Sequence, residues 1–269
     1  MERQTKLLID GDGILYRAGF AVEKTKYLVE KEDTFIPCDS AAETKQIEGG
    51  IVWSRKEIEP LENALFLADT IMDKILGKYP GASYQLWLTP SMGNFREQIA
   101  KTHKYKGNRD VQPRPKYYKD IAKHLVDKHG AVYSDGQEAD DELGIGASVY
   151  GSDAVLVSYD KDLRQIPGKH YNWVEEVEFD VSKKEGLISF YSQVLSGDAT
   201  DNIYGLYGIG PAKASKILAN CSSSRDCWEA VRNAYQSQEG RDQGRDRAIE
   251  NARLLWVRRK PNEIWEPPY

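Results

Sequence analysis

The stretch Lys6-Leu7-Leu8-Ile9-Asp10-Gly11-Asp12 decides the expected fold, because a short apolar run ends abruptly at two carboxylates. The apolar run predicts a buried strand, and the segments that follow it show helical spacing. In a parallel sheet, functional side chains gather beyond the carboxyl ends of the strands. Asp10 and Asp12 are therefore candidate site residues, although Asp-Gly is also common turn chemistry.

Further elements alternate in the same way. Strands are expected at 84–88, 131–133, 154–159 and 171–174, and helices at 58–75 (closed by Gly77), 121–129, 140–150 and from 187 onward. Strands that alternate with helices indicate an α/β fold with a parallel sheet flanked by helices. We expect a catalytic domain at 1–186, interrupted by a polar excursion or hairpin at 21–56, and a helical region at 187–269.

Three more acidic clusters stand beside a predicted strand end or helix start. They are Glu138-Ala139-Asp140-Asp141, Asp160-Lys161-Asp162 and Asp198-Ala199-Thr200-Asp201. Each has a structural explanation, since Asp and Glu are favoured at helix starts. Carboxylates at this density need cations between them if they converge, and Mg²⁺ and Mn²⁺ prefer oxygen ligands. The set predicts a site for two such ions, a common means of hydrolysing phosphodiesters.

Two other stretches suit nucleic acid. The basic segment at 101–120 interleaves cations with tyrosines, which favours phosphates and stacked bases, although it could be only a solvated loop. In Gly208-Ile209-Gly210-Pro211, the glycines let the backbone approach a phosphate that free helix amides can bind. The alternative for this stretch is an ordinary corner between two helices.

Composition sets outer limits on function. The chain has 269 residues, 29% of them charged, and a net charge of -5, which argues against a generally basic nucleic-acid-binding protein but not against a local patch. Three cysteines without a CxxC pair and four histidines argue against zinc and fit a reducing cytoplasm. We see neither a signal peptide nor a stretch near the ~20 apolar residues of a membrane span, so we expect a cytoplasmic protein without membrane contact.

Taken together, these motifs resemble the 5′-nuclease superfamily, which includes flap endonucleases and phage 5′→3′ exonucleases. The resemblance rests on 105–109, 138–141 and 196–210, and it covers residues 7 to about 218 apart from 21–56. Order and spacing are similar to the phage branch. The resemblance implies a PIN-like twisted parallel sheet and a C-terminal helix-hairpin-helix at 203–219 that grips duplex DNA and holds K⁺.

The resemblance also implies roles for single residues. Direct ligands to the two ions would be Asp10, Asp140, Asp141 and Asp160, while Glu138, Asp162, Asp198 and Asp201 would act through water or on the second ion. Lys106 and Arg109 would position the scissile phosphate, and Tyr105 would stack on the terminal base. Further DNA contacts are expected from Arg17, Arg96, Lys104, Gly208, Gly210 and Lys213.

The chain departs from the family pattern in two places. Thr89 stands near the position where many relatives carry another aspartate, before the pair Phe95-Arg96. Either Asp12 supplies the missing charge, or one ion is held less tightly. The segment between Arg109 and Glu138 is also short and contains prolines that break helices, so we expect a reduced arch.

The expected function is therefore two-metal hydrolysis at or near DNA 5′ ends, by a monomer that acts in phage replication or recombination within the host cytoplasm. Duplexes with a 5′ end, overhang or flap are the expected substrates, with RNA–DNA hybrids as a further one. Asp141→Ala is expected to fold without cutting. The rivals are a haloacid-dehalogenase-like phosphatase, suggested by Asp10-Gly11-Asp12-Gly13, and a DNA-binding homologue that has lost a metal, suggested by Thr89.

Overall fold

The computed structural model describes residues 4–108 and 114–268. Contacts divide the chain into two compact units. The first unit comprises Met1–Gly13, Leu76–Pro113 and Gly130–Tyr269, and the second comprises Ile14–Ile75 and Arg114–His129. The division differs from the boundary expected at residue 186, because the C-terminal helices pack in the same unit as the sheet.

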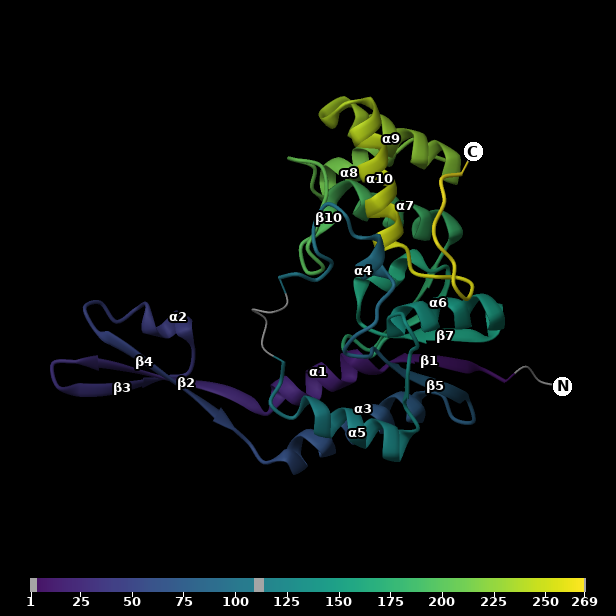
Figure 1. Cartoon of the computed structure of the whole chain (residues 1–269). Coiled ribbons are helices and arrows are strands. Elements are labelled where there is room, and N and C mark those ends of the chain that lie inside the picture. Colours follow the sequence, from purple (N-terminus) through teal and green to yellow (C-terminus); the bar gives the residue numbers. More distant parts are fainter. Residues whose placement is uncertain (1–3, 109–113, 269) are drawn as a thin grey trace. The chain divides into compact units, whose positions relative to one another are not determined.

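A six-stranded sheet forms the centre of the first unit (Figure 1), with the order β6-β5-β1-β7-β8-β9. The strands are β1 (Lys6–Asp10), β5 (Ser83–Leu88), β6 (Val132–Tyr133), β7 (Ala154–Val157), β8 (Gly168–Asn172) and β9 (Val177–Val181). All neighbours pair in parallel except β8 and β9. The predicted α/β class with a mostly parallel sheet flanked by helices is confirmed.

The sequence of β1 explains its central position. Leu7, Leu8 and Ile9 are fully buried, as expected of a strand with neighbours on both edges and layers on both faces. Helix α6 (Ala139–Tyr150) packs on β1 and β7, and its Gly146 lies so close to Leu8 that a Cβ there would be 2.9 Å from the leucine side chain. Asp10, the first residue of the pair Asp10 and Asp12, therefore lies at the end of the strand on which α6 packs.

The helical part of the first unit encloses a second core. Its helices are α4 (Arg96–Ile99), α7 (Lys183–Ser196), α8 (Pro211–Leu218), α9 (Ser224–Glu239) and α10 (Arg241–Leu255). Capping boxes at Ser182 and Ser223 begin α7 and α9. Large aromatic side chains such as Phe190, Trp228 and Tyr235 are buried between these helices.

The expected helix-hairpin-helix at 203–219 is larger than predicted. That range contains one helix, α8, and its partner is α7, which ends at Ser196. Between them lie the paired strands β10 (Gly197–Asp198) and β11 (Ile203–Tyr204). The turn is tight, because a Cβ on Gly205 would stand 2.2 Å from the carbonyl carbon of Ser196.

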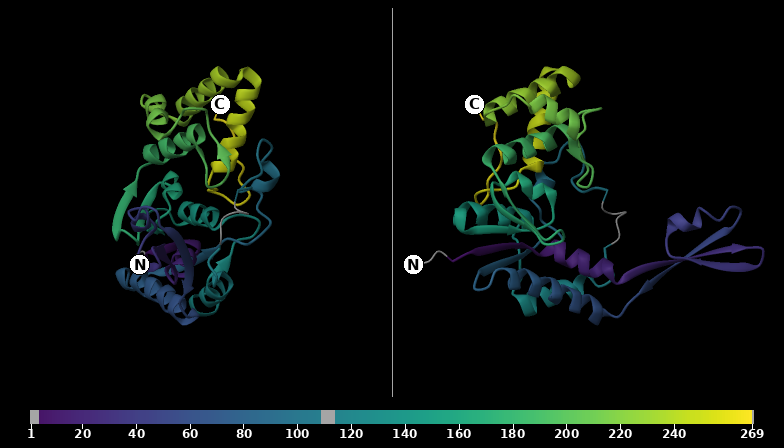
Figure 2. Two further views of the ribbon diagram at one scale, coloured as in Figure 1. Left: turned by 90° about the vertical axis from the view of Figure 1, so that its left-hand side faces the viewer. Right: turned by 180° about the vertical axis from the view of Figure 1, so that it is seen from behind.

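The second unit contains the segment expected to be an excursion (Figure 2). A three-stranded antiparallel sheet, rather than one hairpin, forms there in the order β3-β2-β4. Its elements are β2 (Glu23–Lys31), β3 (Thr34–Cys38), α2 (Ala41–Thr44) and β4 (Ile51–Ile58). The unit also holds most of α1 (Gly11–Ala21) and of α3 (Leu61–Lys78), and all of α5 (Tyr118–His129).

Three sequence expectations were displaced. β9 was missed, and β8 begins at Gly168 rather than at residue 171. Gly77 does not close α3, which continues to Lys78. Within the described residues, no helix combines the length and the apolar character needed to cross a membrane.

We predict that Gly205→Ala lowers the free energy of unfolding by about 2 kcal/mol, because the new methyl group overlaps backbone atoms of Ser196 and Gly197. Gly77→Ala is the matched control. Its Cβ would meet nothing within 4 Å inside α3, so it should raise stability by about 0.5–1 kcal/mol. Urea unfolding of both variants measures the difference, and equal effects would contradict the steric account.

Candidate active site

Asp10 is the last residue of β1, and residues that follow β1 and β7 hold its carboxylate by hydrogen bonds. Its Oδ1 accepts a hydrogen bond from Gly13 N at 3.1 Å, and its Oδ2 accepts one from the Ser158 hydroxyl at 2.8 Å. Ser158 directly follows β7. Burial, strengthened by the charge of Asp12, raises the pKa of Asp10 to about 7. The carboxylate is thus fixed in place but carries an unfavourable charge that a cation would stabilise.

Thr89 joins Asp12 to the start of α6. Thr89 N donates to Oδ1 and Oδ2 of Asp12 at 3.2 and 3.3 Å, while Thr89 Oγ1 accepts a hydrogen bond from Ala139 N at 2.9 Å. Burial raises the pKa of Asp12, and the Thr89 hydrogen bonds only partly offset that effect. Thr89 therefore orients the Asp12 carboxylate and holds the first amide of α6.

The carboxylates of the first unit raise one another's pKa values. Burial raises the pKa of Asp140 well above its usual value, and the charges of Asp10, Asp160 and Glu138 raise it further. The pKa of Asp162 is raised to about 8, mainly by burial and then by the charges of Asp160 and Asp198. These charges act on one another, but no three of these carboxylates are among the described residues that bring ligand atoms within 4.8 Å of one another, so convergence of the clusters on an ion stays a prediction. A set of carboxylate oxygens fits a hard divalent ion.

Asp141 is placed differently from the other acids. It is fully buried, and its carboxylate faces Arg96, whose Nη1 and Nη2 donate at 2.6 and 2.9 Å. The backbone amides of Arg258 and Glu138 donate to the same carboxylate at 3.0 and 3.1 Å. Four hydrogen bonds use the lone-pair positions of a carboxylate. This geometry argues against direct metal ligation by Asp141.

Arg96 corrects a second expectation. Its side chain is 3% exposed, and beyond Asp141 it donates to the backbone oxygens of Leu254 and Trp256, each at 2.8 Å. The guanidinium therefore joins the end of α10 to the start of α6 and is not available to DNA. Arg258, from the tail that had no predicted role, completes this contact through its amide.

The basic segment docks on the last acidic cluster. Lys106 N donates to Asp201 O at 2.9 Å, and Asn108 Nδ2 donates to Ala199 O at 2.7 Å. Lys106 Nζ pairs with the carboxylate of Glu138 and lies 3.7 Å from that of Asp201. Lys106 adopts a φ of 53°, an uncommon conformation for a residue with a side chain and one that often marks a functional position.

Tyr105 is not a platform for a stacked base. The ring is 5% exposed and belongs to the core of the helical part. Its hydroxyl donates to Asp201 Oδ2 at 2.9 Å and to Glu138 Oε1 at 3.2 Å. From the helical core, Tyr105 therefore positions the carboxylates of Glu138 and Asp201.

Asp162 and Asp198 line a cavity of about 970 Å³ that also reaches the hairpin at Gly210 and Pro211. Asp162 Oδ1 accepts a hydrogen bond from Gln193 Nε2 of α7 at 2.6 Å, and Asp198 Oδ1 accepts one from Thr200 N at 2.8 Å. Asp160 caps the following 3₁₀ helix by accepting from Asp162 N at 2.8 Å. Asp162 and Asp198 thus share one hollow with the hairpin, whereas Asp10, Asp12 and Asp140 do not line it.

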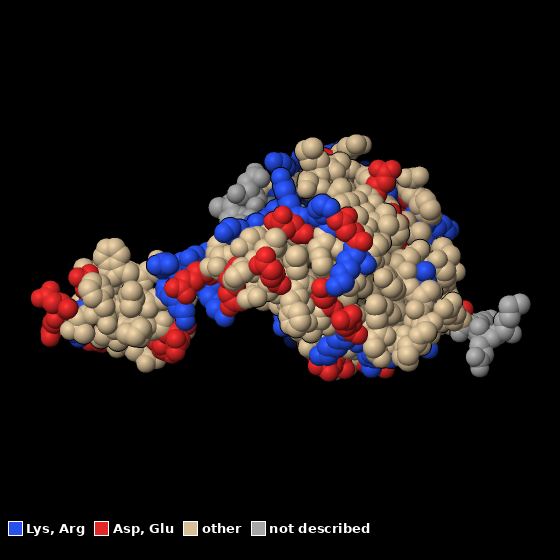
Figure 3. Space-filling view, turned by 90° about the horizontal axis from the view of Figure 1, so that it is seen from below, with Lys and Arg blue, Asp and Glu red and all other residues tan. Residues whose placement is uncertain are grey.

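The remaining expected DNA contacts are exposed or lie elsewhere. Lys104, Gly208, Gly210 and Lys213 are exposed, and Lys213 Nζ donates to Gly208 O at 2.8 Å. Gly210 caps α8 without a side-chain hydrogen bond. Arg17 is exposed on α1 in the second unit, and Arg109 lies outside the described residues. On the face drawn in Figure 3, basic and acidic side chains are interleaved rather than separated.

Sequence reasoning missed three supporting residues. Ser158 and Gln193 hold Asp10 and Asp162, and the Thr89 hydroxyl holds the start of α6. For Ser158, its position directly after a buried strand was an available signal. Gln193 gave none, because its partner is 31 residues away along the chain.

Known proteins with similar sequences include nucleases and bacterial DNA polymerases I. An exodeoxyribonuclease of Enterobacteria phage T3 is 27% identical over 211 residues, which are 76% of this chain and 63% of that protein. A flap endonuclease of Shewanella amazonensis is 30% identical over 125 residues, 40% of this chain and 49% of that protein. The chain thus spans less than two thirds of the length of these relatives. It matches no protein-family model.

The fold is shared with a phage nuclease of known structure. The flap endonuclease of bacteriophage T5, solved with DNA and metal ions, superimposes with a TM-score of 0.62 at 15% identity. The match covers 94% of this chain and 89% of that protein. Sequence and fold together confirm the resemblance drawn from the motifs.

The Asp141–Arg96 pair yields a prediction that revises the earlier one. Asp141→Ala leaves the buried guanidinium of Arg96 uncompensated and should cost about 3–5 kcal/mol of unfolding free energy. The adjacent Asp140→Ala is the control: it removes one charge from a repelling cluster, so the metal-free protein should keep or gain stability. Urea unfolding in EDTA separates the two. A stably folded Asp141→Ala protein would contradict the structural role.

The raised pKa values of Asp10 and Asp162, about 7 and about 8, predict a pH dependence. Between about pH 5 and pH 8 the folded metal-free protein holds protons that the unfolded chain has released, so stability should fall as pH rises through this range and level off above it. Excess Mg²⁺ should flatten the slope, since the ion favours ionised carboxylates. Unfolding curves at successive pH values measure it, and Asp162→Asn should reduce the slope. A rise in stability across this range in EDTA would contradict the prediction.

Proposed function

We propose that this chain, which shares sequence similarity and fold with the 5′-nuclease superfamily, is a divalent-metal-dependent 5′→3′ exonuclease or structure-specific 5′ nuclease. The observation that carries the proposal is the set of mutually repelling, mostly half-buried carboxylates beside a lysine-bearing segment. An all-oxygen cluster calls for hard cations, and a lysine next to it suits a phosphate. Mg²⁺ or Mn²⁺, two ions together, are the proposed cofactors.

The carboxylates divide by their hydrogen bonds. Asp10 ends β1, Asp160 follows β7 and Asp140 lies in the first turn of α6; together with Asp12 they are proposed to hold one ion. Asp162 and Asp198, which line the cavity next to the hairpin, would hold the second. Asp141 leaves the ligand set because its oxygens bind Arg96 and two backbone amides. When bound, such ions lower the pKa of the attacking water and stabilise the leaving oxygen.

Lys106 has two candidate partners for its charge. In the free protein its Nζ pairs with Glu138 and lies near Asp201. A scissile phosphate placed over the carboxylates would compete for the same ammonium group and gain charge stabilisation in the transition state. Glu138 and Asp201 are then the residues that hold Lys106 ready, with Tyr105 supporting both carboxylates from the core. Arg109 stays a proposed second cation.

The hairpin between α7 and α8 is the proposed grip on duplex DNA. The start of α8 presents amides that no side chain caps, and Gly208 and Gly210 leave room for a phosphate. Lys213 already places an ammonium group on the carbonyl of Gly208, so the K⁺ implied by the resemblance would share these carbonyls with Lys213. Lys104 and Arg17 are proposed as outer phosphate contacts.

The proposed substrate is DNA with a 5′ end, overhang or flap next to a duplex. Backbone contacts of this kind do not read bases, so an RNA–DNA hybrid is a further proposed substrate. A monomer acting in phage replication or recombination, in the host cytoplasm, is the setting that we propose from the phage relatives.

The deciding experiment is digestion of 5′-labelled and 3′-labelled duplex, flap and hybrid substrates with Mg²⁺, with Mn²⁺ and with EDTA. We expect release of short products from the 5′ end that stops in EDTA. Turnover of a small phosphate ester with DNA left intact would identify a phosphatase instead. Binding of 5′-overhang DNA without cleavage in Mn²⁺ would identify a DNA-binding homologue.

Within the same assay, Asp140→Asn should lower cleavage about a thousandfold, because it removes a carboxylate from the centre of the cluster. DNA binding, measured by fluorescence anisotropy in Ca²⁺, should change little. Asp135→Asn, an exposed acid of the preceding loop, is the matched control and should cut normally. Equal activity of the two variants would remove Asp140 from the mechanism.

A further inference from the structure

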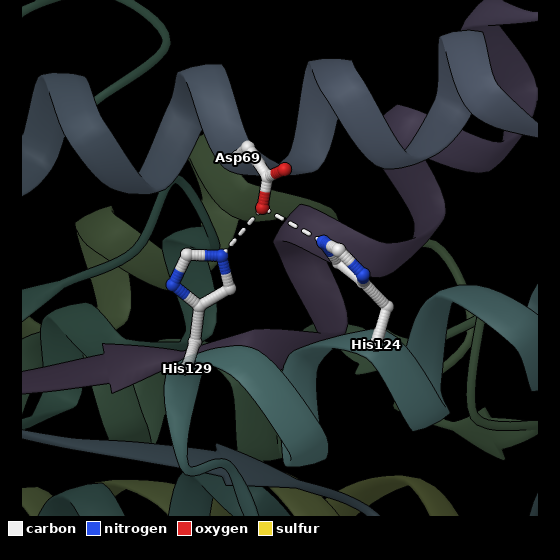
Figure 4. A group of neighbouring side chains, drawn as sticks. All are labelled: Asp69, His124 and His129. Carbon is white, nitrogen blue, oxygen red and sulfur yellow. Dashed lines mark hydrogen bonds and ion pairs between the residues drawn. The ribbon is translucent and has the colours of Figure 1, made fainter.

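The second unit carries a group of metal-ligating side chains that the proposed nuclease does not use. Figure 4 shows Asp69 of α3 facing His124 and His129 of α5. Nε2 of each imidazole lies 2.7 Å from the same oxygen, Oδ1 of Asp69. One ligand atom from each residue, two nitrogens and one oxygen, lies within 4.8 Å of the others.

Asp69 and His124 are half-buried between two helices, and His129 is buried. The exposed fractions are 20% for Asp69, 19% for His124 and 8% for His129. His129 is the last residue of α5, and Gly130 follows with a φ of 66°, which ends the helix. The group is therefore held by regular backbone on both sides while one edge stays open to solvent.

Lys128 sets the orientation of the carboxylate. Its Nζ donates to Oδ2 of Asp69 at 2.8 Å, which leaves Oδ1 for the two imidazoles. A carboxylate fixed by a hydrogen bond on its other oxygen is typical of a metal ligand.

We propose that Asp69, His124 and His129 bind one Zn²⁺ ion, or a similar divalent transition-metal ion, that joins α3 to α5. Two imidazole nitrogens and a carboxylate oxygen form a ligand set that zinc favours, with water in the fourth position. Zinc coordinates such atoms at about 2.0–2.2 Å, which in a tetrahedron places ligand atoms about 3.4 Å apart. The imidazoles would therefore move apart slightly from Asp69 as the ion enters.

This site differs in ligand chemistry from the acidic cluster. The cluster offers oxygens and suits Mg²⁺ or Mn²⁺, whereas imidazole nitrogens favour zinc over magnesium. The proposed ion is structural, so its binding stabilises the folded second unit and does not enter phosphodiester hydrolysis. The inference consequently holds or fails independently of the proposed nuclease activity.

The test is titration of the full-length metal-free protein with Zn²⁺ and with Co²⁺, in excess Mg²⁺ so that the acidic cluster is occupied. We expect one ion per chain, a visible absorption band of Co²⁺ with a nitrogen-containing site, and a higher Tm with Zn²⁺. His124→Gln should weaken binding at least about a hundredfold and remove the Tm shift.

Two matched variants make the result decisive. His103→Gln changes an exposed histidine of the first unit, and Asp140→Asn changes the acidic cluster; both should bind Zn²⁺ as the unmodified protein does. His124→Gln is chosen because His124 is more exposed than His129 and its loss should leave the fold intact. Stoichiometric binding that persists in His124→Gln, that disappears in Asp140→Asn, or that is absent from the unmodified protein would overturn the proposal.

Discussion

The buried ion pair between Arg96 and Asp141 holds the rest of the site in place. It joins the start of α6 to the end of α10, because Arg96 also donates to backbone oxygens at Leu254 and Trp256. Glu138 and Asp140 stand on that same first turn of α6 and repel the acids at the ends of β1 and β7. A helix start that carries this repulsion needs an anchor on its inner side. Asp141 provides that anchor, so the proposed metal-binding role falls to its neighbours.

Around the acidic cluster, other side chains likewise hold a carboxylate in place. Thr89 holds Asp12 and the first amide of α6, Ser158 holds Asp10, and Gln193 holds Asp162. Each neutral side chain orients a carboxylate without neutralising it. The repulsion between the ionised forms therefore persists, and it contributes to the raised pKa values of Asp10 and Asp162. Such a site is poorly stable when empty and gains most from a bound cation, which is the electrostatic condition for metal-assisted hydrolysis.

The sequence predicted the parts of this site that depend on local pattern. A buried run that ends at Asp10, and acids at a helix start, locate strand ends and therefore the cluster. Tyr105 and Arg96 were misplaced because their partners lie far away: Arg96 bonds to Leu254 O across 158 residues. A tyrosine among cations predicts a surface, yet here its ring completes the helical core. Gly77 was read as a helix end, although a helix with packed neighbours tolerates a glycine on its exposed side.

The histidines are a second case in which the sequence did not reveal which side chains lie together in space. The small number of histidines, four in the chain, argued against a zinc site. That argument is incomplete because a count does not show which histidines lie close together. His124 and His129 lie on one short helix, and α3 brings Asp69 to both of them. A set of two imidazoles and one carboxylate selects for different ions than a set of carboxylates does. The imidazole-containing set would therefore hold Zn²⁺ even in excess Mg²⁺, whereas the carboxylate set would hold whichever hard divalent ion is most abundant.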